Sequence, residues 1–264
     1  MILLSCARTL YTNAMVSKPL VIAPSSFTLH KSLSHIAFIM DGNGRWAKAR
    51  GLPRHLGHKA ACERIIDVIN NCMEFNIRVI SLYAFSTENW KRPKAEINHL
   101  FNYLDLFFKR ELATLIQDGI RVMISGDVSA LPLKTQKTIA NAIKETANCQ
   151  KHILNICLNY GGQQEIIYAV KKIAAKVAAN EIKVDEINET LLANHLYTAL
   201  LPPVDLMIRT SGEYRLSNFL LWQNAYAEFV FPTVHWPDFD REQLVACLKE
   251  YENRDRRFGG LKNE

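Results

Sequence analysis

The chain has 264 residues, of which 48% are hydrophobic, and a formal net charge of +6. This length suffices for one domain with a substantial core, and no low-complexity linker divides it. No apolar run reaches the roughly 18 residues needed to span a bilayer, which argues against an integral membrane helix. The positive charge is spread along the chain without a basic block, so an anionic small molecule suits it at least as well as a nucleic acid.

Cysteine usage indicates a reducing compartment and no structural zinc. None of the six cysteines shows a CxxC spacing, and most lie in apolar periodic segments where a buried thiol is the ordinary state. A cytoplasmic location is therefore expected. The six are Cys6, Cys62, Cys72, Cys149, Cys157 and Cys247.

The first 34 residues have a mixed composition that predicts no regular element. Their opening segment Met1-Ile-Leu-Leu-Ser-Cys6 is apolar but too short for the core of a signal peptide. We expect residues 1–34 to form a poorly ordered extension and residues 35–264 to form the functional domain. Met15 is an alternative start.

From residue 36 onward, apolar periodicity predicts strands that alternate with helices. Strands are short β-branched or apolar runs, and helices place apolar residues at steps of three and four. In chain order we expect a strand at 36–40, a helix at 58–75, a strand at 77–83, a helix from Pro93 to near Gly119, a strand at 120–125, a helix at 133–148, a strand at 153–158, helices at 163–179 and 189–200, and a strand at 204–208.

This alternation predicts an α/β fold with a central, mainly parallel sheet, because crossover helices join parallel strands and cover both faces. Ligands bind beyond the carboxyl ends of the strands in such sheets. Three polar segments follow predicted strands: Asp41–Arg45, Ser86–Arg92 and Arg209–Ser217. The sequence therefore predicts a binding site at this edge.

The segment Asp41-Gly-Asn-Gly-Arg-Trp-Ala47 carries the chemistry of an anion site. Glycine lacks the Cβ that would block close approach of backbone N–H groups to an anion. Arg45 adds a planar cation with paired donors, which suits a diphosphate better than a neutral ligand. A Gly-x-Gly pair alone is weak, and a plain glycine-rich turn is the alternative.

Four segments together resemble the cis-prenyltransferase family. They are His35–Ala47, Arg54 with Gly57-His58, Tyr83–Trp90 with Arg92, and Asp205–Ser217. The resemblance continues through Asn218–Gln223, Ala227-Glu228, Trp236–Phe239 and Arg256–Gly260, so it covers the chain from about residue 35. It departs from the family at Ala61, where a glycine is frequent, and in the N-terminal extension.

The resemblance implies a single catalytic domain over 35–264 with an apolar tunnel. It implies a Mg²⁺-dependent transferase that adds isopentenyl diphosphate units to farnesyl diphosphate with cis double bonds. The expected product is a long-chain polyprenyl diphosphate of about eleven units. That product would be undecaprenyl diphosphate, the lipid-carrier precursor for cell-wall polysaccharide such as peptidoglycan.

The resemblance also assigns roles to individual residues. Asp41 and Asn89 are the catalytic residues, although Asn89 is expected to orient substrate while a diphosphate oxygen takes the proton, since a neutral amide is a poor base. Asp41 and Glu228 are the expected Mg²⁺ ligands. The expected substrate-binding residues are Gly42, Asn43, Gly44, Arg45, Trp46, Arg54, His58, Ser86, Thr87, Glu88, Trp90, Arg92, Arg209, Arg215, Leu216 and Ser217.

Within this set, Arg54 and the Asp41 loop are expected to hold the allylic diphosphate, and Arg209, Arg215 and Ser217 the isopentenyl diphosphate. The family further implies a homodimer, in which the tail Arg256–Gly260 reaches the neighbouring site. Peripheral contact with the inner face of the membrane is also expected. No nucleic-acid partner is expected.

Three other functions are weighed against this one. A non-catalytic partner of the same fold would lack the carboxylates and arginines that this chain keeps. A nucleotide-dependent phosphotransferase would show a P-loop or a Rossmann glycine pattern. A nucleic-acid binder has the least support. His58 alone would be a capping or core histidine, and the aromatic face Phe101, Leu104 and Phe108 would by periodicity be packing.

Overall fold

The computed structural model describes residues 27–254 of the chain. At its centre lies a six-stranded sheet in the order β3-β4-β2-β1-β5-β6, in which every neighbouring pair is parallel. The expected parallel α/β architecture is therefore confirmed. The strands are β1 His35–Ile39, β2 Val79–Ser86, β3 Ile120–Ser125, β4 His152–Tyr160, β5 Leu206–Arg209 and β6 Glu228–Val230.

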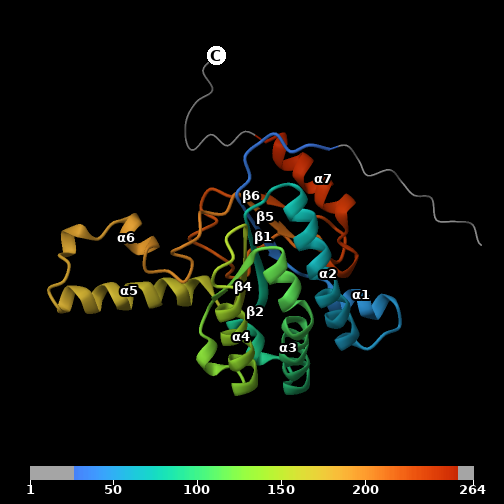
Figure 1. Cartoon of the computed structure of the whole chain (residues 1–264), viewed down its shortest axis with the longest axis horizontal. Helices are drawn as coiled ribbons and strands as arrows, with labels where there is room; N and C mark the ends of the chain where they lie inside the picture. Colours follow the sequence, from blue (N-terminus) through green and yellow to red (C-terminus); the bar gives the residue numbers. More distant parts are fainter. Residues whose placement is uncertain (1–26, 255–264) are drawn as a thin grey trace, which may run out of the picture.

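Helices join the strands and pack beside the sheet (Figure 1). The longest, α2 and α3, pack against each other and contribute many of the side chains of the larger apolar core. The α-helices are α1 Asn43–Ala49, α2 Arg54–Glu74, α3 Lys94–Gln117, α4 Leu133–Glu145, α5 Gly162–Ala178, α6 Glu189–Ala193 and α7 Arg241–Glu252.

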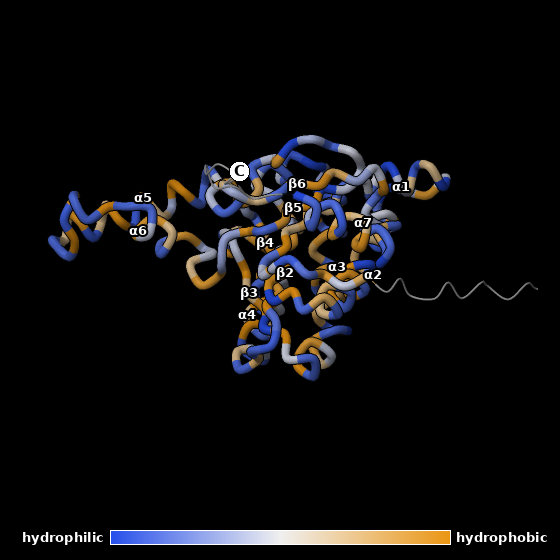
Figure 2. The backbone as a smooth tube through the Cα atoms, turned by 90° about the horizontal axis from the view of Figure 1, so that it is seen from above, coloured by the Kyte–Doolittle hydropathy of each residue, from blue (hydrophilic) through white to orange (hydrophobic). Residues whose placement is uncertain are grey.

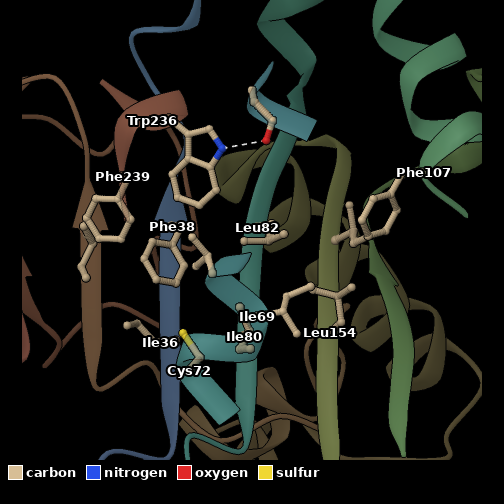
Figure 3. Packing of buried hydrophobic residues seen from close by; sticks show 14 of the residues in the cluster. Ile36, Phe38, Ile69, Cys72, Ile80, Leu82, Phe107, Leu154, Trp236 and Phe239 are labelled. Atoms are coloured by element: carbon tan, nitrogen blue, oxygen red, sulfur yellow. Dashed lines mark hydrogen bonds between the residues drawn. The ribbon is translucent and has the colours of Figure 1, made fainter. Parts of the chain in front are cut away.

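The two faces of the sheet build two cores because successive side chains of a strand point to opposite sides. On β1, Ile36 and Phe38 join the larger core with α2, α3 and α7, whereas Ala37 and Ile39 join a smaller one with Phe219. Figure 3 shows the larger core, where Trp236 reaches across to α2 and donates its indole N–H to the Ala61 carbonyl at 3.0 Å.

Helices α5 and α6 extend away from the rest of the body, as Figures 1 and 2 both show. Helix α6 ends at Ala193, whereas the sequence predicts a helix from 189 to 200. Turns fill the remainder, in which Leu196 and Thr198 are buried and Leu200 is 71% exposed. We refer to residues 162–200 as the arm.

The segment 27–34 is packed on the body and differs from the expected loose extension. Leu33 is buried in the larger core, and Phe27 lies against Phe75 with ring centroids 5.8 Å apart. Tyr251 of α7 donates its hydroxyl to the Ser32 carbonyl at 2.8 Å. Apolar side chains before residue 34 therefore have partners far along the chain. Residues 1–26 lie outside the described part.

Three elements were not expected from periodicity. Helix α1 and strand β6 have seven and three residues, too few to show a period. Helix α7 is longer, and the side chain of Asp240 caps it by accepting from the backbone N–H of Gln243. Among residues 27–254, no helix is long and apolar enough to cross a membrane.

Candidate active site

A cavity of about 310 Å³ opens at the carboxyl ends of β1, β2 and β5. Its mouth is polar and its interior is apolar. The mouth is lined by Asp41, Gly42, Asn43, Gly44, Arg45, Arg54, His58, Ser86, Asn89, Arg92, Arg209 and Ser217, and the interior mainly by Ala61, Cys62, Ile65, Leu82, Leu100, Phe101, Leu104, Phe107, Ile156 and Leu158. Such a cavity suits a ligand with a charged head and an apolar tail.

The loop between β1 and α1 reaches the mouth through two glycines. Gly42 has φ +94°, and a Cβ built on it would lie 2.0 Å from the Ser211 hydroxyl oxygen, so only glycine fits. Gly57 of α2 lets that helix pack closely, since a Cβ there would lie 1.9 Å from the Asn43 carbonyl oxygen. The start of α1, with N–H groups that have no intrahelical partner, is thereby held beside Asp41.

Asp41 is the carboxylate of the mouth and carries a negative charge at neutral pH. Its Oδ2 accepts from Arg209 at 2.8 Å, and its Oδ1 accepts from the Gly42 N–H at 2.6 Å and from Arg45 at 3.2 Å. Partial burial alone would raise its pKa, but the hydrogen bonds from Arg209 and Gly42 outweigh that effect and lower the pKa.

Arg209 is 4% exposed and is held by three oxygen atoms. Besides Asp41, its guanidinium donates to the Arg215 carbonyl and to the Ser217 hydroxyl, both at 2.7 Å. Next to it, Glu213 bridges two exposed cations by accepting from Arg45 at 2.6 Å and from Arg215. We call Asp41, Arg45, Arg209, Glu213 and Arg215 the strand-end cluster.

A second group of charges lies at the starts of α2 and α3. Glu96 lies 3.3 Å from Arg54 Nε and 3.1 Å from Arg92 Nη1, and His58 Nε2 approaches it to 3.3 Å. Burial would raise the Glu96 pKa, but the charges of Arg54 and Arg92 lower it. We call Arg54, His58, Arg92 and Glu96 the helix-start cluster.

His58 is neutral at physiological pH. Burial lowers its pKa to about 4; Glu96 opposes this shift, and the positive charges of Arg92 and Arg54 add to it. Its approach to Glu96 is therefore not a charged pair. Within the described part of the chain, its buried Nε2 has no hydrogen-bond partner.

The short 3₁₀ helix Thr87–Lys91 follows β2 and fixes Asn89. A bulge in β2, seen as register shifts around Phe85, precedes it. The Asn89 side-chain oxygen accepts from the Ser86 backbone N–H at 3.1 Å, a capping interaction. Trp90 donates to Asn159 at 2.8 Å and packs edge-on against Phe85.

Unpaired polar atoms gather at this site. Of seven buried side-chain polar atoms without a partner between residues 27 and 254, three belong to residues that line the mouth: Asn43 Oδ1, His58 Nε2 and Arg209 Nε. A fourth, Thr87 Oγ1, belongs to the 3₁₀ helix. Because buried polar groups are normally hydrogen-bonded, these atoms point to a polar ligand.

Twelve of the expected site residues line the cavity, and the others do not. The Trp46 indole turns outward, where it donates to Asp238 at 2.7 Å and lies under Arg50. The Glu88 carboxylate accepts from the Asn218 side chain at 3.0 Å. The expected residues outside the lining are Trp46, Thr87, Glu88, Trp90, Arg215, Leu216 and Glu228.

The structure does not bring Glu228 to Asp41 within one chain. Glu228 begins β6 and pairs in register with Leu206, at the amino end of β5, whereas Asp41 lies beyond the carboxyl end of β1. Its carboxylate faces Arg254 at 3.3 Å. Within one chain the two carboxylates therefore lie at opposite ends of the sheet, since a parallel sheet separates the two ends of its strands.

Asp41 alone fits Mg²⁺ at this mouth. No group of three or more His, Cys, Asp or Glu side chains able to hold a metal occurs among residues 27–254. Mg²⁺ commonly binds through one or two carboxylates together with substrate phosphates and keeps several waters. The ionised and partly exposed carboxylate of Asp41 meets that requirement, with a diphosphate as the second source of oxygen.

Two carboxylates of the site were missed by the sequence interpretation. Glu96 follows Arg92 by four residues at the start of a helix, a spacing that places both on one face. Glu213 stands between Arg209 and Arg215 in the loop after β5. Each cluster of arginines could therefore have been predicted to contain its own counter-charge.

Comparisons with known proteins agree with this geometry. Residues 39–259 match the family described as "Putative undecaprenyl diphosphate synthase". An isoprenyl transferase of Heliobacterium mobile is 50% identical over 88% of this chain and 90% of its own length. A farnesyl-diphosphate-specific ditrans,polycis-undecaprenyl-diphosphate synthase of Lactiplantibacillus plantarum is 48% identical over 86% of this chain and 89% of its own length.

A solved structure has the same fold. Lavandulyl diphosphate synthase from Lavandula x intermedia, in complex with dimethylallyl diphosphate, superposes with a TM-score of 0.84 and 34% identity over 86% of this chain and 98% of that one. Residues 39–259 contain strands β2 to β6 and both charged clusters. The chain therefore belongs to the undecaprenyl diphosphate synthase family of isoprenyl transferases.

Proposed function

We propose that this protein adds isopentenyl diphosphate units to farnesyl diphosphate and releases a long-chain polyprenyl diphosphate, with undecaprenyl diphosphate as the product. The observation that supports this best is one cavity with two arginine clusters at its mouth and an apolar interior. The two diphosphates of the reaction require two arginine clusters, and the growing hydrocarbon requires an apolar interior.

The helix-start cluster would bind the allylic diphosphate together with the start of α1. Arg54 and Arg92 would give up part of their contact with Glu96 and donate to the phosphate oxygens. Neutral His58 would donate through Nε2, the nitrogen that has no hydrogen-bond partner. When the allylic C–O bond breaks, negative charge grows on the departing diphosphate. Guanidinium groups already in place stabilise that charge without reorganisation.

The strand-end cluster would bind isopentenyl diphosphate. Arg209 is fixed by Ser217 and by the Arg215 carbonyl, so its orientation costs little on binding. Arg215 would exchange the Glu213 carboxylate for oxygens of isopentenyl diphosphate, and Arg45, which shares that carboxylate, would then be free to reach the allylic diphosphate, as the family resemblance implies. Asp41 would hold Mg²⁺, which supplies positive charge to a diphosphate when bound.

Asn89 would position the isopentenyl group and not accept its proton. Its amide oxygen is already occupied by the Ser86 N–H at 3.1 Å, and a neutral amide is a poor base. A diphosphate oxygen, held close by the arginines, would accept the proton instead. The allylic C–O bond breaks, the new C–C bond forms and the proton passes to phosphate.

The apolar interior would receive the tail. Each methylene removed from water contributes about 0.8 kcal/mol, so a cavity lined by Leu, Ile and Phe side chains draws the hydrocarbon inward. The polar mouth keeps the diphosphate outside. We propose that this cavity is the start of the tunnel expected from the family resemblance.

We further propose a homodimer that forms through the arm. Ile167, Val170, Val184 and Leu200 are 47–71% exposed, which is apolar surface without a partner in one chain. Ile167→Glu should shift the protein from dimer to monomer in sedimentation velocity, and an unchanged coefficient would contradict the arm interface. A cytoplasmic location with contact at the inner face of the membrane is part of the proposal, since the product is a lipid.

The direct test is an assay with radiolabelled isopentenyl diphosphate and farnesyl diphosphate, with and without Mg²⁺. The proposal predicts a ladder of butanol-extractable products that depends on Mg²⁺. A nucleotide phosphotransferase would instead turn over ATP, and a non-catalytic partner would form no product. Absence of product with both substrates and Mg²⁺ would reject the proposed activity.

A further inference from the structure

Left-handed backbone gathers around the cavity mouth. Seven non-glycine residues between positions 27 and 254 have a positive φ, between 44° and 76°. Two of them, Asn76 and Asn180, lie just past the ends of α2 and α5, where a left-handed residue is common. The other five lie at the end of β4 or in the loop after β5: Asn159, Ser211, Ser217, Asn218 and Leu220. Left-handed residues other than glycine cost energy and cluster at functional sites.

Asn159 holds the 3₁₀ helix Thr87–Lys91 from one side. Its side-chain oxygen accepts from the Trp90 indole N–H at 2.8 Å, and its side-chain nitrogen donates to the Asp127 carbonyl at 2.8 Å. The amide has only this orientation, because an indole nitrogen only donates and a carbonyl only accepts. With φ +45°, Asn159 links Trp90 to the loop that follows β3.

Asn218, anchored on the first turn of α5, holds the same 3₁₀ helix from another side. Its side-chain oxygen accepts from the Gln163 backbone N–H at 2.9 Å. Its NH₂ group therefore faces the other way and donates to Glu88 and to Gln164, both at 3.0 Å. Burial alone would raise the Glu88 pKa, but hydrogen bonds, that from Asn218 foremost, lower it. The bond from Asn218 to Glu88 therefore has an ionised acceptor, which strengthens it.

These two bonds flank Asn89 and stand in for the burial that the 3₁₀ helix lacks. None of the five residues of the 3₁₀ helix is buried, and Trp90 is 38% exposed. Glu88 and Trp90 are the neighbours of Asn89, so the two asparagines hold the chain one residue before it and one residue after it. Gly161 permits the close approach, since a Cβ there would lie 2.9 Å from the Thr87 hydroxyl oxygen.

Asn89 faces the cavity with one half of its amide free. It lines the mouth, and its side-chain oxygen accepts from the Ser86 backbone N–H at 3.1 Å. No partner for its NH₂ group occurs among residues 27–254. That group can donate to a diphosphate oxygen of the substrate. Its position follows that of residues 88 and 90, since a 3₁₀ helix fixes the three residues relative to one another.

We propose that Asn159 and Asn218 are positioning residues, which hold Trp90 and Glu88 and thereby place Asn89 for the condensation. In this assignment, which rests on the proposed function, Glu88 and Trp90 act outside the cavity lining, where their polar groups bind the framework of the protein.

The test replaces each asparagine by glycine, because glycine keeps the left-handed backbone and removes only the side chain. The purified full-length enzyme is given farnesyl diphosphate, isopentenyl diphosphate and Mg²⁺, and a single condensation is measured. For Asn159→Gly and Asn218→Gly we expect kcat to fall about tenfold, with KM for farnesyl diphosphate within about twofold of the parent, since neither asparagine lines the cavity. A merely structural role would lower the melting temperature and leave kcat per folded enzyme unchanged.

Asn76→Gly is the matched control. Asn76 has φ +56° and no side-chain hydrogen bond among residues 27–254, so this change introduces glycine at a left-handed position without releasing the 3₁₀ helix. It should leave kcat and both KM values as in the parent.

A double-variant cycle tests whether Asn159 acts through Trp90. Trp90→Phe removes the indole N–H and keeps an aromatic ring. In that background Asn159→Gly should lower kcat by less than about twofold, against about tenfold in the parent, because the bond is already lost.

Equal losses in both backgrounds would overturn the inference, and so would an unchanged kcat in Asn159→Gly and Asn218→Gly. If one of these two variants does not fold, the other decides by the same criterion. Failure of the parent enzyme to condense the two substrates would reject the proposed function instead, so the two failures are distinguishable.

Discussion

The two charged clusters at the cavity mouth are built from the same residue types but differ in rigidity. In the strand-end cluster, the Arg209 side chain is 5% exposed and bonds to Asp41 and to Ser217. In the helix-start cluster, the Arg54 side chain is 62% exposed, and its only close carboxylate in the described part of the chain is Glu96. The Arg209 guanidinium is thus held in one place, whereas the exposed Arg54 guanidinium is free to move.

This difference suggests that each cluster binds a different substrate. A fixed cluster suits the substrate that binds anew in each cycle, because preorganised donors lose little entropy on binding. An adjustable cluster suits the allylic diphosphate, whose position changes as its tail grows. Four experiments can break or sharpen this comparison.

The largest expected effect is that of Asp41→Asn in the strand-end cluster. Asparagine is nearly isosteric and can keep the turn, but it cannot supply the charge that faces Arg209 and would hold Mg²⁺. We expect a folded protein whose kcat falls about 10²-fold or more, equivalent to about 2.7 kcal/mol of transition-state stabilisation.

The control for that change is Asp238→Asn, which removes a carboxylate that accepts from Trp46 and Arg50 outside the cavity. It should retain most of the turnover. Near-normal turnover of Asp41→Asn at limiting Mg²⁺ would mean that the carboxylate only shapes the loop.

The next largest expected effect is a loss of folding stability in acid, to which His58 of the helix-start cluster contributes. Burial lowers the pKa of His58 to about 4, and that of His35 to about 4 as well, against an unfolded value near 6.5. The unfolded chain then binds more protons below pH 6.5, so stability falls as pH decreases toward 4. At pH 5 each histidine costs about 2 kcal/mol of unfolding free energy.

Urea unfolding at pH 7 and pH 5 gives the loss of unfolding free energy on acidification. His58→Gln should reduce that loss by about 2 kcal/mol, the contribution of one histidine. His99→Gln, at an exposed histidine on the neighbouring helix, is the control for the substitution itself. If His58→Gln also behaves like the parent, His58 takes up its proton as readily in the folded chain as in the unfolded chain, and burial does not lower its pKa.

The smallest expected effect is that of shortening the N-terminal segment, which lies far from both clusters. It shows how much a loss of stability alone changes the kinetics. A chain that begins at Ser32 loses Phe27, which packs on Phe75, and Leu29, which packs on the larger core. We expect a loss of about 2 kcal/mol in unfolding free energy with little change in either KM. A chain that begins at Phe27 should match the full chain, and a truncation at Ser32 with unchanged stability would show that these contacts carry no weight.

Much of this architecture was predictable from the sequence. The alternation of strands with long amphipathic helices predicted the parallel sheet. The three polar segments that follow strands lie at one edge of the sheet, as expected. Short elements such as α1 and β6 carry too few residues for a period and were missed. The docking of Phe27 was missed because its partner, Phe75, lies far along the chain.

Side-chain direction was the least predictable part of the site. Trp46 is one residue from Arg45, yet successive helical residues point about 100° apart, and its indole faces Asp238 instead of the cavity. Glu228 was assigned by resemblance, and its place at the start of β6 follows from strand register, which no local pattern reveals. Arg256–Gly260, expected to reach a neighbouring site, lies outside the described residues.

The central claim is that the two clusters hold two different diphosphates. It is tested most directly by measuring both KM values for Arg209→Lys and for Arg54→Lys, since lysine keeps the charge but loses paired donation. The account predicts that Arg209→Lys raises KM for isopentenyl diphosphate about tenfold with a smaller change for farnesyl diphosphate, and that Arg54→Lys does the reverse. Equal changes in both KM values for both variants would contradict it.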